Sequence, residues 1–362
     1  MVQGVPTDAD LVALPKAHLH LHLTGGMRHA TLLELAAVHG VRLPERLVDD
    51  EPDDWRVLGW ARFQRLYDLA RGVLRSPADI GRLVQEIAED ERSAGSRWLE
   101  LQVTPTGYAV PLGDVVTAME VFCAAAADAQ AVTGVGIRLV VAANRTRPPW
   151  EAEMLARLAV RFRDHGVVGF GLSNDERAGR VDDFAKAARL AREGGLVGLP
   201  HAGELLGPAA VERTLDVLEP VRIGHGVRAV EDPRVTSLLA ERGIACEVCP
   251  ASNVALGVFA GHEAVPLRPL EEAGVPVVLA ADDPLLFGAG LVEQYAAARD
   301  VHGYGREDLA RLARASVRHS TMPAEVQTGV LADIDAWLTE AHGEPRATSH
   351  APRAPGVGSG GG

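Results

Sequence analysis

The sequence Lys16-Ala17-His18-Leu19-His20-Leu21-His22-Leu23 places three histidines at alternate positions in a short apolar run. Residues i, i+2 and i+4 of a β-strand project from the same face of a sheet. Such a row can be the polar edge of a strand, but imidazoles on one face also suit a divalent metal, because neutral imidazole nitrogen is a preferred ligand of Zn²⁺. The run therefore predicts a first strand that carries metal ligands.

Similar short runs rich in Val, Leu, Ile and Gly recur along the chain and alternate with amphipathic stretches. This composition suits buried parallel strands. Eight strands alternating with helices predict an α/β fold, a (β/α)₈ TIM barrel, with a doubly wound sheet as the alternative. No G-x-G-x-x-G follows the first strand, which disfavours that alternative. The expected strands are Lys16–Leu23, Arg97–Val103, Val135–Ala143, Gly166–Leu172, Leu196–His201, Val221–His225, Ile244–Val248 and Val275–Ala281.

An unusually long stretch, residues 25–96, separates the first two expected strands. Helical periodicity appears in it at Thr31–His39, Trp60–Val73 and Ala78–Ser93. Insertions after the first strand of a barrel lie at the mouth where active sites are found. We interpret this segment as a helical cap that shields a substrate from water.

Three more helices are expected after the last strand, at Glu293–Val301, Arg306–Ser320 and Pro323–His342. From Gly343 the chain is rich in Pro, Gly and Ser and has no apolar periodicity, which is typical of a disordered tail. We therefore expect one barrel domain over residues 1–342 and a disordered tail over residues 343–362.

Composition narrows the class of protein. The chain has 362 residues, of which 47% are hydrophobic and 23% charged, as in soluble globular proteins. The formal net charge of −13 repels polyanions, so neither nucleic acid nor an anionic membrane is expected as the main partner. No signal peptide and no transmembrane run of 18 or more apolar residues is apparent. Three cysteines are too few for a disulfide framework, so a cytoplasmic location is expected.

Polar side chains collect at the ends of the expected strands, and a barrel brings those ends onto one face. Three neutral imidazoles and one carboxylate would form a four-ligand shell of net charge +1 around Zn²⁺, with room for a water. The metal would lower the pKa of that water toward neutrality. The residues expected to form the shell are His20, His22, His201 and Asp282.

The order of motifs along the chain resembles the adenosine deaminase family of metal-dependent hydrolases. The resemblance runs from about Leu14 to about Pro323 and is closest to a bacterial adenosine deaminase-like subgroup with GFGLSNDE and ADDPLLFG. It rests on Leu14-Pro15-Lys16, His20-Leu21-His22-Leu23, HAGE at 201–204, GHG at 224–226, CPASN at 249–253 and DDP at 282–284. It implies a barrel with one zinc ion that converts adenosine or deoxyadenosine to inosine or deoxyinosine and ammonia.

The resemblance also implies a role for each matching residue. It makes His20, His22, His201 and Asp282 the zinc ligands. Glu204 would donate a proton to purine N1, which requires a raised pKa. His225 would orient the zinc-bound hydroxide that attacks C6, or act as a base.

The remaining predicted contacts are with the substrate. Asp283 would bond to the N7 edge of the purine, and the backbone around Asn174 would approach the N3 edge. Thr24 stands where the family usually has an aspartate that contacts the ribose 5′-hydroxyl, and a neutral hydroxyl bonds more weakly. His18 precedes the ligands on the strand, so we expect it to pack outside the metal shell.

The departure at Thr24 leaves the substrate open. Adenosine or deoxyadenosine is the first choice, and adenine or a 5′-modified adenosine such as aminodeoxyfutalosine are the alternatives. A catalytically inactive purine-binding protein on the same scaffold is the alternative from another class, and Glu204 argues against it because binding alone needs no acid. The oligomeric state is not predicted.

The scarcity of lysine favours a single metal ion. Many related barrels bridge two metals with a modified lysine at the end of the fourth strand, where this chain has Gly171-Leu172-Ser173-Asn174. The only lysines are Lys16, at the base of the first strand, and Lys186, in an expected helix.

Overall fold

The computed structural model of the chain describes residues 5–48 and 59–340. Its strands pair in parallel in two sheets, ordered β1-β2-β3-β4-β5 and β6-β7-β8-β9. The strands are β1 (Lys16–His22), β2 (Ser96–Val103), β3 (Gly136–Asn144), β4 (Val167–Ser173), β5 (Val197–Gly198), β6 (His201–Ala202), β7 (Arg222–His225), β8 (Ala245–Val248) and β9 (Val277–Leu279). All eight expected strands are therefore present, and β5 with β6 makes up the fifth.

The barrel closes between its first and last strands. The backbone N–H of His22 donates to the carbonyl of Asp282 at 3.0 Å, and the N–H of Asp282 donates to the carbonyl of His20 at 3.1 Å. Leu21 and Asp282 form a parallel bridge at this seam. The parallel barrel predicted from the alternating strands and helices is confirmed, and its closure places Asp282 beside the histidine strand.

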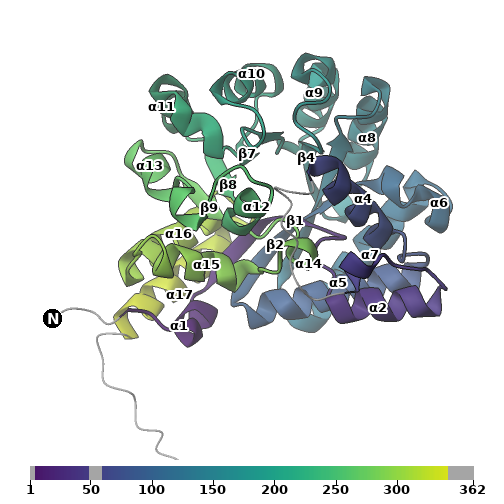
Figure 1. Ribbon diagram of the computed structural model, residues 1–362, viewed down its shortest axis with the longest axis horizontal. Helices are drawn as coiled ribbons and strands as arrows, with labels where there is room; N and C mark the ends of the chain where they lie inside the picture. Colours follow the sequence, from purple (N-terminus) through teal and green to yellow (C-terminus); the bar gives the residue numbers. More distant parts are fainter. Residues whose placement is uncertain (1–4, 49–58, 341–362) are drawn as a thin grey trace, which may run out of the picture.

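A ring of helices surrounds the strands, as Figure 1 shows. Their bounds along the first half of the chain are α1 (Asp8–Ala13), α2 (His29–Val38), α4 (Trp60–Arg71), α5 (Pro77–Ser93), α6 (Ala109–Leu112), α7 (Val115–Thr133) and α8 (Pro149–Arg161). In the second half they are α9 (Ala185–Glu193), α10 (Pro208–Leu218), α11 (Pro233–Arg242), α12 (Pro250–Ala255), α13 (Leu267–Glu272), α14 (Pro284–Phe287), α15 (Leu291–Asp300), α16 (Arg306–Arg318) and α17 (Ala324–Glu340).

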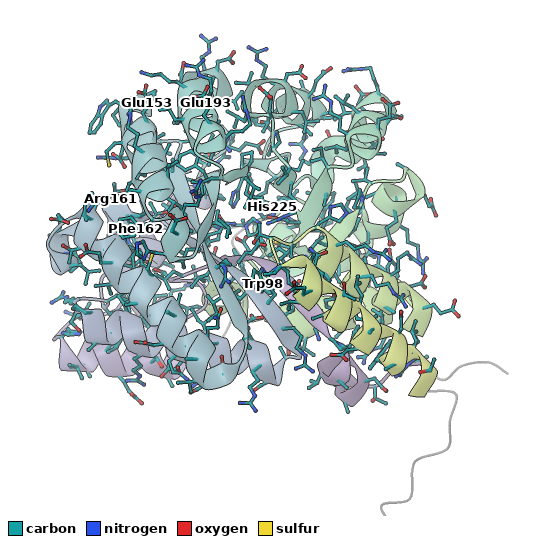
Figure 2. All side chains as sticks on the ribbon, turned by 180° about the vertical axis from the view of Figure 1, so that it is seen from behind. Trp98, Glu153, Arg161, Phe162, Glu193 and His225 are labelled. Carbon is teal, nitrogen blue, oxygen red and sulfur yellow. The ribbon has the colours of Figure 1, made fainter. Side chains whose placement is uncertain are left out.

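The alternation of β1 sorts its side chains between two environments. Leu19 and Leu21 are buried in the apolar layers between the strands and the helices. His20 is buried among polar side chains inside the barrel, next to Glu247 of β8, whereas His18 is buried next to Glu91 of the surrounding helix α5. The pairing register of β1 with β2 shifts between His18 and Leu21. In the view from behind, His225 and Trp98 lie near the centre of the molecule, while Glu153 and Glu193 lie on outer helices (Figure 2).

The segment between β1 and β2 divides into a wall of the mouth and a part of the ring. Helix α5 packs against β2 and α7, so it takes the place of an ordinary barrel helix. Helix α4 turns its side chains toward the mouth, where Phe63 stacks on Phe287 of α14 at a centroid distance of 5.4 Å. The expected cap at residues 25–96 is thus represented at the mouth by α4, and its residues 49–58 lie outside the described residues.

The expected disordered tail at residues 343–362 also lies outside the described residues. Within them, one helix, α7, is long and apolar enough to cross a membrane by length and composition alone. It carries Glu120 and Asp128 and packs against α5 and β3. This position is typical of a core helix in a barrel.

Candidate active site

Three histidines and an aspartate meet at the mouth of the barrel. The ligand atoms of His20, His22, His201 and Asp282 all lie within 4.8 Å of one another. The Nε2 atoms of His22 and His201 are 3.3 Å apart, and Asp282 Oδ1 lies 3.4 Å from His20 Nε2 and 3.2 Å from His22 Nε2. The structure therefore brings together the four residues that the sequence analysis assigned to the metal.

These distances fit a tetrahedral metal ion. Zinc binds imidazole nitrogen and carboxylate oxygen at about 2.0–2.2 Å, and the edge of such a tetrahedron is roughly 3.3–3.6 Å. The Nε2 of His20 has no hydrogen-bond partner among the described residues, although it is buried. A buried imidazole nitrogen without a partner, facing two other imidazoles and a carboxylate, suits a divalent cation.

Gly224 allows the imidazoles to approach closely. A Cβ atom at this position would lie 2.7 Å from Cε1 of His20 and 3.2 Å from Cγ of His201. Any larger residue would therefore displace metal-facing rings, which explains the glycine before His225.

A chain of buried charges stands behind His20. Its Nδ1 lies 2.9 Å from Oε2 of Glu247, whose Oε1 accepts from Nε of Arg222 at 2.6 Å. Arg222 also bonds to Glu100, which in turn accepts from the backbone N–H of Thr321 at 2.6 Å. Burial opposes ionisation of Glu247, but Arg222 and His20 lower its pKa to about 2. This row of buried charged side chains thus holds the Glu247 carboxylate against Nδ1 of His20, the ring nitrogen that faces away from the metal cluster.

Residues after β8 orient two further groups of the site. The hydroxyl of Ser252 donates to Oδ2 of Asp282 at 2.7 Å. The side-chain amide nitrogen of Asn253 lies 3.3 Å from Nδ1 of His225. Burial lowers the pKa of His225 to about 3, so its imidazole is neutral at pH 7. The Asn253 amide therefore donates to Nδ1, and the Nε2 of His225 carries the hydrogen.

Three residues of the site have a strained backbone conformation. Asn174, His225 and Asp282 have φ angles of 79°, 62° and 64°, which non-glycine residues seldom adopt. Such conformations cluster at functional sites, where the surrounding structure holds them in place.

Glu204 is a buried carboxyl group beside the cluster. Its Oε2 lies 3.7 Å from Nε2 of His225, and its Oε1 has no partner among the described residues. Burial, followed by the negative charges of Asp282 and Glu176, raises its pKa well above the usual range. The group is therefore set up to hold a proton, as the sequence analysis requires of an acid.

Asp283 resembles Glu204 in its surroundings. Burial and the charge of Asp282 raise its pKa well above the usual range. Its Oδ1 has no partner among the described residues. A Cβ on Gly25 would lie only 1.9 Å from this oxygen, so the glycine after Thr24 makes room for Asp283.

The cluster opens into a cavity of about 630 Å³, within the range of small-molecule sites. His22, His201, Glu204, His225, Asp282 and Asp283 line its inner end. Its other walls carry the side chains of Trp60, Phe63, Gln64, Tyr67, Asp68, Arg71, Thr104, Thr106, Asn144, Thr146, Arg147, Ser173, Asn174, Asp175 and Leu256.

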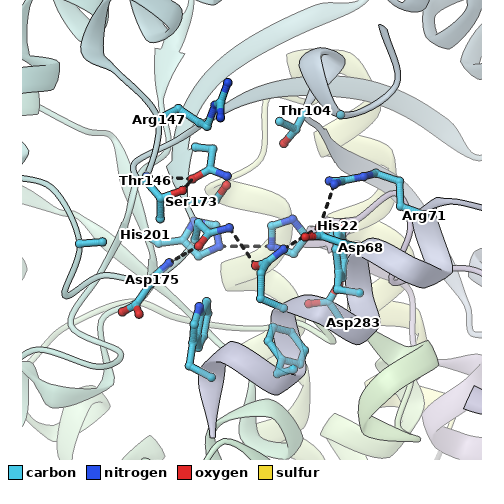
Figure 3. A pocket seen from close by; sticks show the side chains of 18 of the residues that line it. His22, Asp68, Arg71, Thr104, Thr146, Arg147, Ser173, Asp175, His201 and Asp283 are labelled. Atoms are coloured by element: carbon cyan, nitrogen blue, oxygen red, sulfur yellow. Dashed lines mark hydrogen bonds and ion pairs between the residues drawn. The ribbon is translucent and has the colours of Figure 1, made fainter. Parts of the chain in front are cut away.

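One wall of the cavity is a row of hydrogen bonds from α4, which Figure 3 shows. The amide nitrogen of Asn174 donates to Oε1 of Gln64 at 2.8 Å, and Nε2 of Gln64 donates to Oδ1 of Asp68 at 3.0 Å. Arg71 donates to the same Asp68 oxygen at 2.7 Å. The row ties α4 to the loop after β4.

Two predicted residues have other surroundings. His18 lies outside the metal cluster, as expected: its Nδ1 lies 2.7 Å from Glu91, and its Nε2 accepts the N–H of Ala281. Thr24 is fully buried and its hydroxyl lies 2.6 Å from that of Tyr108. Thr24 is not among the residues that line the cavity.

Sequence reasoning assigned no role to several residues that hold the site together. They are Glu100, Arg145, Glu176, Arg222, Glu247, Ser252 and Asn253. Glu176, Ser252 and Asn253 lie within quoted motifs, yet their partners are distant in the sequence. The side chains of α4 were also missed, because amphipathic periodicity does not identify which helix faces a cavity.

A parallel barrel with a three-histidine, one-aspartate cluster and a buried acid at its mouth defines a metal-dependent hydrolase. Comparison with known proteins makes this class specific. Residues 15–337 match the family model described as adenosine deaminase, and the chain belongs to this family.

Relatives in bacteria cover nearly the whole chain. A putative adenosine/adenine deaminase of Streptomyces virginiae is 58% identical, covering 91% of this chain and 98% of its own. An adenine deaminase of Agrobacterium fabrum is 34% identical over 89% of this chain and 98% of the relative's length. An amidohydrolase from Burkholderia ambifaria, solved with bound Zn, is 25% identical and superposes with a TM-score of 0.82. The match covers 94% of this chain and 97% of the amidohydrolase. The chain is thus a purine aminohydrolase of the adenosine deaminase family.

Proposed function

We propose that the protein is a zinc-dependent deaminase that replaces the 6-amino group of a purine with oxygen, with adenosine and deoxyadenosine as its first substrates. The observation that carries the proposal is the buried Glu204 carboxyl beside the four-residue metal cluster. A metal cluster alone is compatible with many hydrolases. A buried acid with a raised pKa beside the cluster is what attack of water on a ring carbon next to a basic ring nitrogen requires, because the acid can protonate that nitrogen.

The four cluster residues would hold the metal. Bound Zn²⁺ supplies Lewis acidity that brings the pKa of a water toward neutrality. The solved relative with bound Zn supports this choice of metal.

Protein groups supply the remaining steps. Glu204 donates its proton to N1, which removes the aromaticity of the ring and opens C6 to water. His225, held by Asn253, stays neutral and orients the attacking oxygen through Nε2. Asp283, whose pKa is raised by burial and by the charge of Asp282, bonds to the N7 edge of the purine. The oxygen of the water becomes the 6-oxo group. One of its protons leaves with the 6-amino group as ammonia, and the other restores the Glu204 carboxyl, so the 6-oxopurine keeps the proton on N1.

The size and polarity of the cavity favour a nucleoside over a free base. Beyond the inner end it continues to the hydroxyls of Thr104, Thr106 and Thr146 and to the guanidinium of Arg147. A purine at the cluster leaves this polar part for a sugar. We propose that the backbone around Asn174, which lines the cavity, approaches the N3 edge of the purine.

Free adenine is the second candidate. The hydroxyl of Thr24, which the family resemblance assigns to the ribose, is bonded to Tyr108. The 34% identical relative is named an adenine deaminase.

A substrate panel tests the proposal. Adenosine, deoxyadenosine, adenine and a 5′-modified adenosine are each incubated with zinc-loaded protein, and ammonia and the ultraviolet spectrum are followed. We expect the highest kcat/KM for adenosine or deoxyadenosine. Release of ammonia from adenine alone would replace the nucleoside by the base, and no ammonia from any purine would refute the proposal.

A further inference from the structure

The carboxylate of Glu176 is bound by four consecutive backbone amides. Its Oε1 accepts from the N–H of Gly203 at 2.7 Å. Its Oε2 accepts from the N–H groups of Glu204, Leu205 and Leu206 at 3.0, 2.8 and 2.9 Å. Glu176 is itself buried and comes from the loop after β4, so one side chain fixes the whole segment after β6.

The backbone of this segment is shaped for an anion. Gly203 has a φ of 72°, which turns successive N–H groups toward one point. Concave sets of backbone N–H groups bind anions, and hydrogen bonds to an ionised acceptor are stronger than neutral ones. The segment includes Glu204. The Glu176 carboxylate that occupies this concavity therefore determines the position of the Glu204 side chain.

We propose that Glu176 is the positioning residue for the proton donor Glu204, an inference that rests on the proposed function. It acts through the backbone of residues 203–206. The side chain of Glu204 reaches the cavity while that of Glu176 does not line it, so Glu176 has no access to the substrate.

The same loop is fixed from a second side. Arg145 donates to the carbonyl of His201 at 2.6 Å and is buried next to Glu176 and Glu204. Its positive charge offsets the burial of Glu176. Glu176 therefore anchors the amides of the loop, while Arg145 anchors the carbonyl of the metal-facing histidine.

The most informative variant is Glu176→Gln. Glutamine keeps the size of the side chain but replaces one acceptor oxygen with an NH₂ donor. That donor would face backbone N–H groups, so at least one of the four bonds must break. Glu176→Asp keeps the charge but is shorter by one methylene, so it should retain part of the function.

Hydrogen exchange tests the anchoring without reference to activity. In zinc-loaded Glu176→Gln protein we expect the amides of residues 203–206 to exchange at least about tenfold faster than in wild type, as for the loss of about 1.4 kcal/mol of local stability. The matched control is Asp79→Asn, because Asp79 accepts from the N–H groups of Arg75 and Ser76, both at 2.9 Å, at the start of α5. The control should speed exchange at residues 75 and 76 only. Unchanged exchange at residues 203–206 in Glu176→Gln overturns the proposal.

A double-mutant cycle tests the route through Glu204. Glu176→Gln should lower kcat by about 10- to 100-fold in the wild-type background, since small misplacements of a reacting group cost this much. In the Glu204→Gln background the same change should cost less than about twofold, because the acid is already gone. Glu176→Asp should be intermediate, and Asp79→Asn should leave kcat unchanged. All rates are divided by measured zinc content.

An equal loss of kcat in both backgrounds would show that Glu176 supports the barrel in general, and would overturn the proposal. If wild-type protein deaminates no purine, the proposed function fails. The exchange measurement then still decides whether Glu176 holds the loop.

Discussion

Nδ1 of His20 and Oε2 of Glu247 lie 2.9 Å apart, and both side chains are buried. A carboxylate at Nδ1 fixes the tautomer in which Nδ1 carries the hydrogen and Nε2 offers its lone pair to the cluster. We expect Glu247→Gln to weaken zinc binding by about 10- to 100-fold, the usual effect of losing such a partner. Competition with a coloured chelator measures the affinity.

The control for this change is Glu91→Gln. Glu91 contacts Nδ1 of His18 at 2.7 Å in the same geometry, but His18 lies outside the metal cluster. Its loss should leave zinc affinity unchanged. Equal weakening in both variants would mean that loss of a buried carboxylate, and not the tautomer of His20, lowers affinity.

Glu204→Gln should abolish proton donation to the purine while leaving the other side chains of the site in place. We expect kcat to fall by about 10²- to 10⁴-fold, the usual contribution of a general acid. Zinc content and the Kd of a non-hydrolysable purine should change little, because the metal cluster and Asp283 remain. Turnover at the wild-type rate would remove Glu204 from the mechanism.

Gln64 bridges α4 and the loop after β4 through Asn174. Gln64→Ala should raise KM for the nucleoside by roughly 5- to 10-fold, as for the loss of one hydrogen bond in the wall of the cavity. The midpoint of thermal unfolding should move little. The matched control is Gln85→Ala on α5, since the Gln85 side chain donates to Glu89 at the surface, away from the cavity. Steady-state kinetics of both variants decide whether the α4 wall contacts the substrate.

Acid should weaken the contact between α1 and α16. Burial raises the pKa of Asp10, but hydrogen bonds from Arg306 and Thr7 outweigh it and lower the pKa from 3.8 to about 2. The carboxylate therefore stabilises the fold above pH 4, and this contribution is lost as the pH falls through about 2. In urea unfolding, wild type should be more stable than Asp10→Asn at pH 6, and the difference should shrink at pH 3. A constant difference would mean that Asp10 does not act through its charge.

Local sequence pattern predicted the barrel and the four cluster residues. Alternation along Lys16–His22 placed the histidines on one face, and the convergence of strand ends in a barrel brought His201 and Asp282 to the same mouth. The ligand types that zinc prefers and the family resemblance then selected these two residues from the other polar groups at the strand ends. The same alternation does not separate His18 from His20. Only the structure shows that His18 pairs with Glu91 and His20 with Glu247.

Residues that orient the site were missed for a physical reason. Glu176 and Glu247 act through bonds to groups 25 or more positions away, and spacing along one chain carries no record of such pairs. Thr24 shows the opposite difficulty. Its place in a motif assigned it to the sugar, whereas its hydroxyl is bonded to that of Tyr108.

The most direct test of the central claim couples metal content to chemistry. The protein is stripped with a chelator, reloaded with measured amounts of Zn²⁺, and assayed for ammonia released from adenosine and adenine. We predict activity that rises linearly to one zinc per chain and then levels off. Full activity in the stripped protein, or no ammonia from either purine at one zinc per chain, would contradict the account.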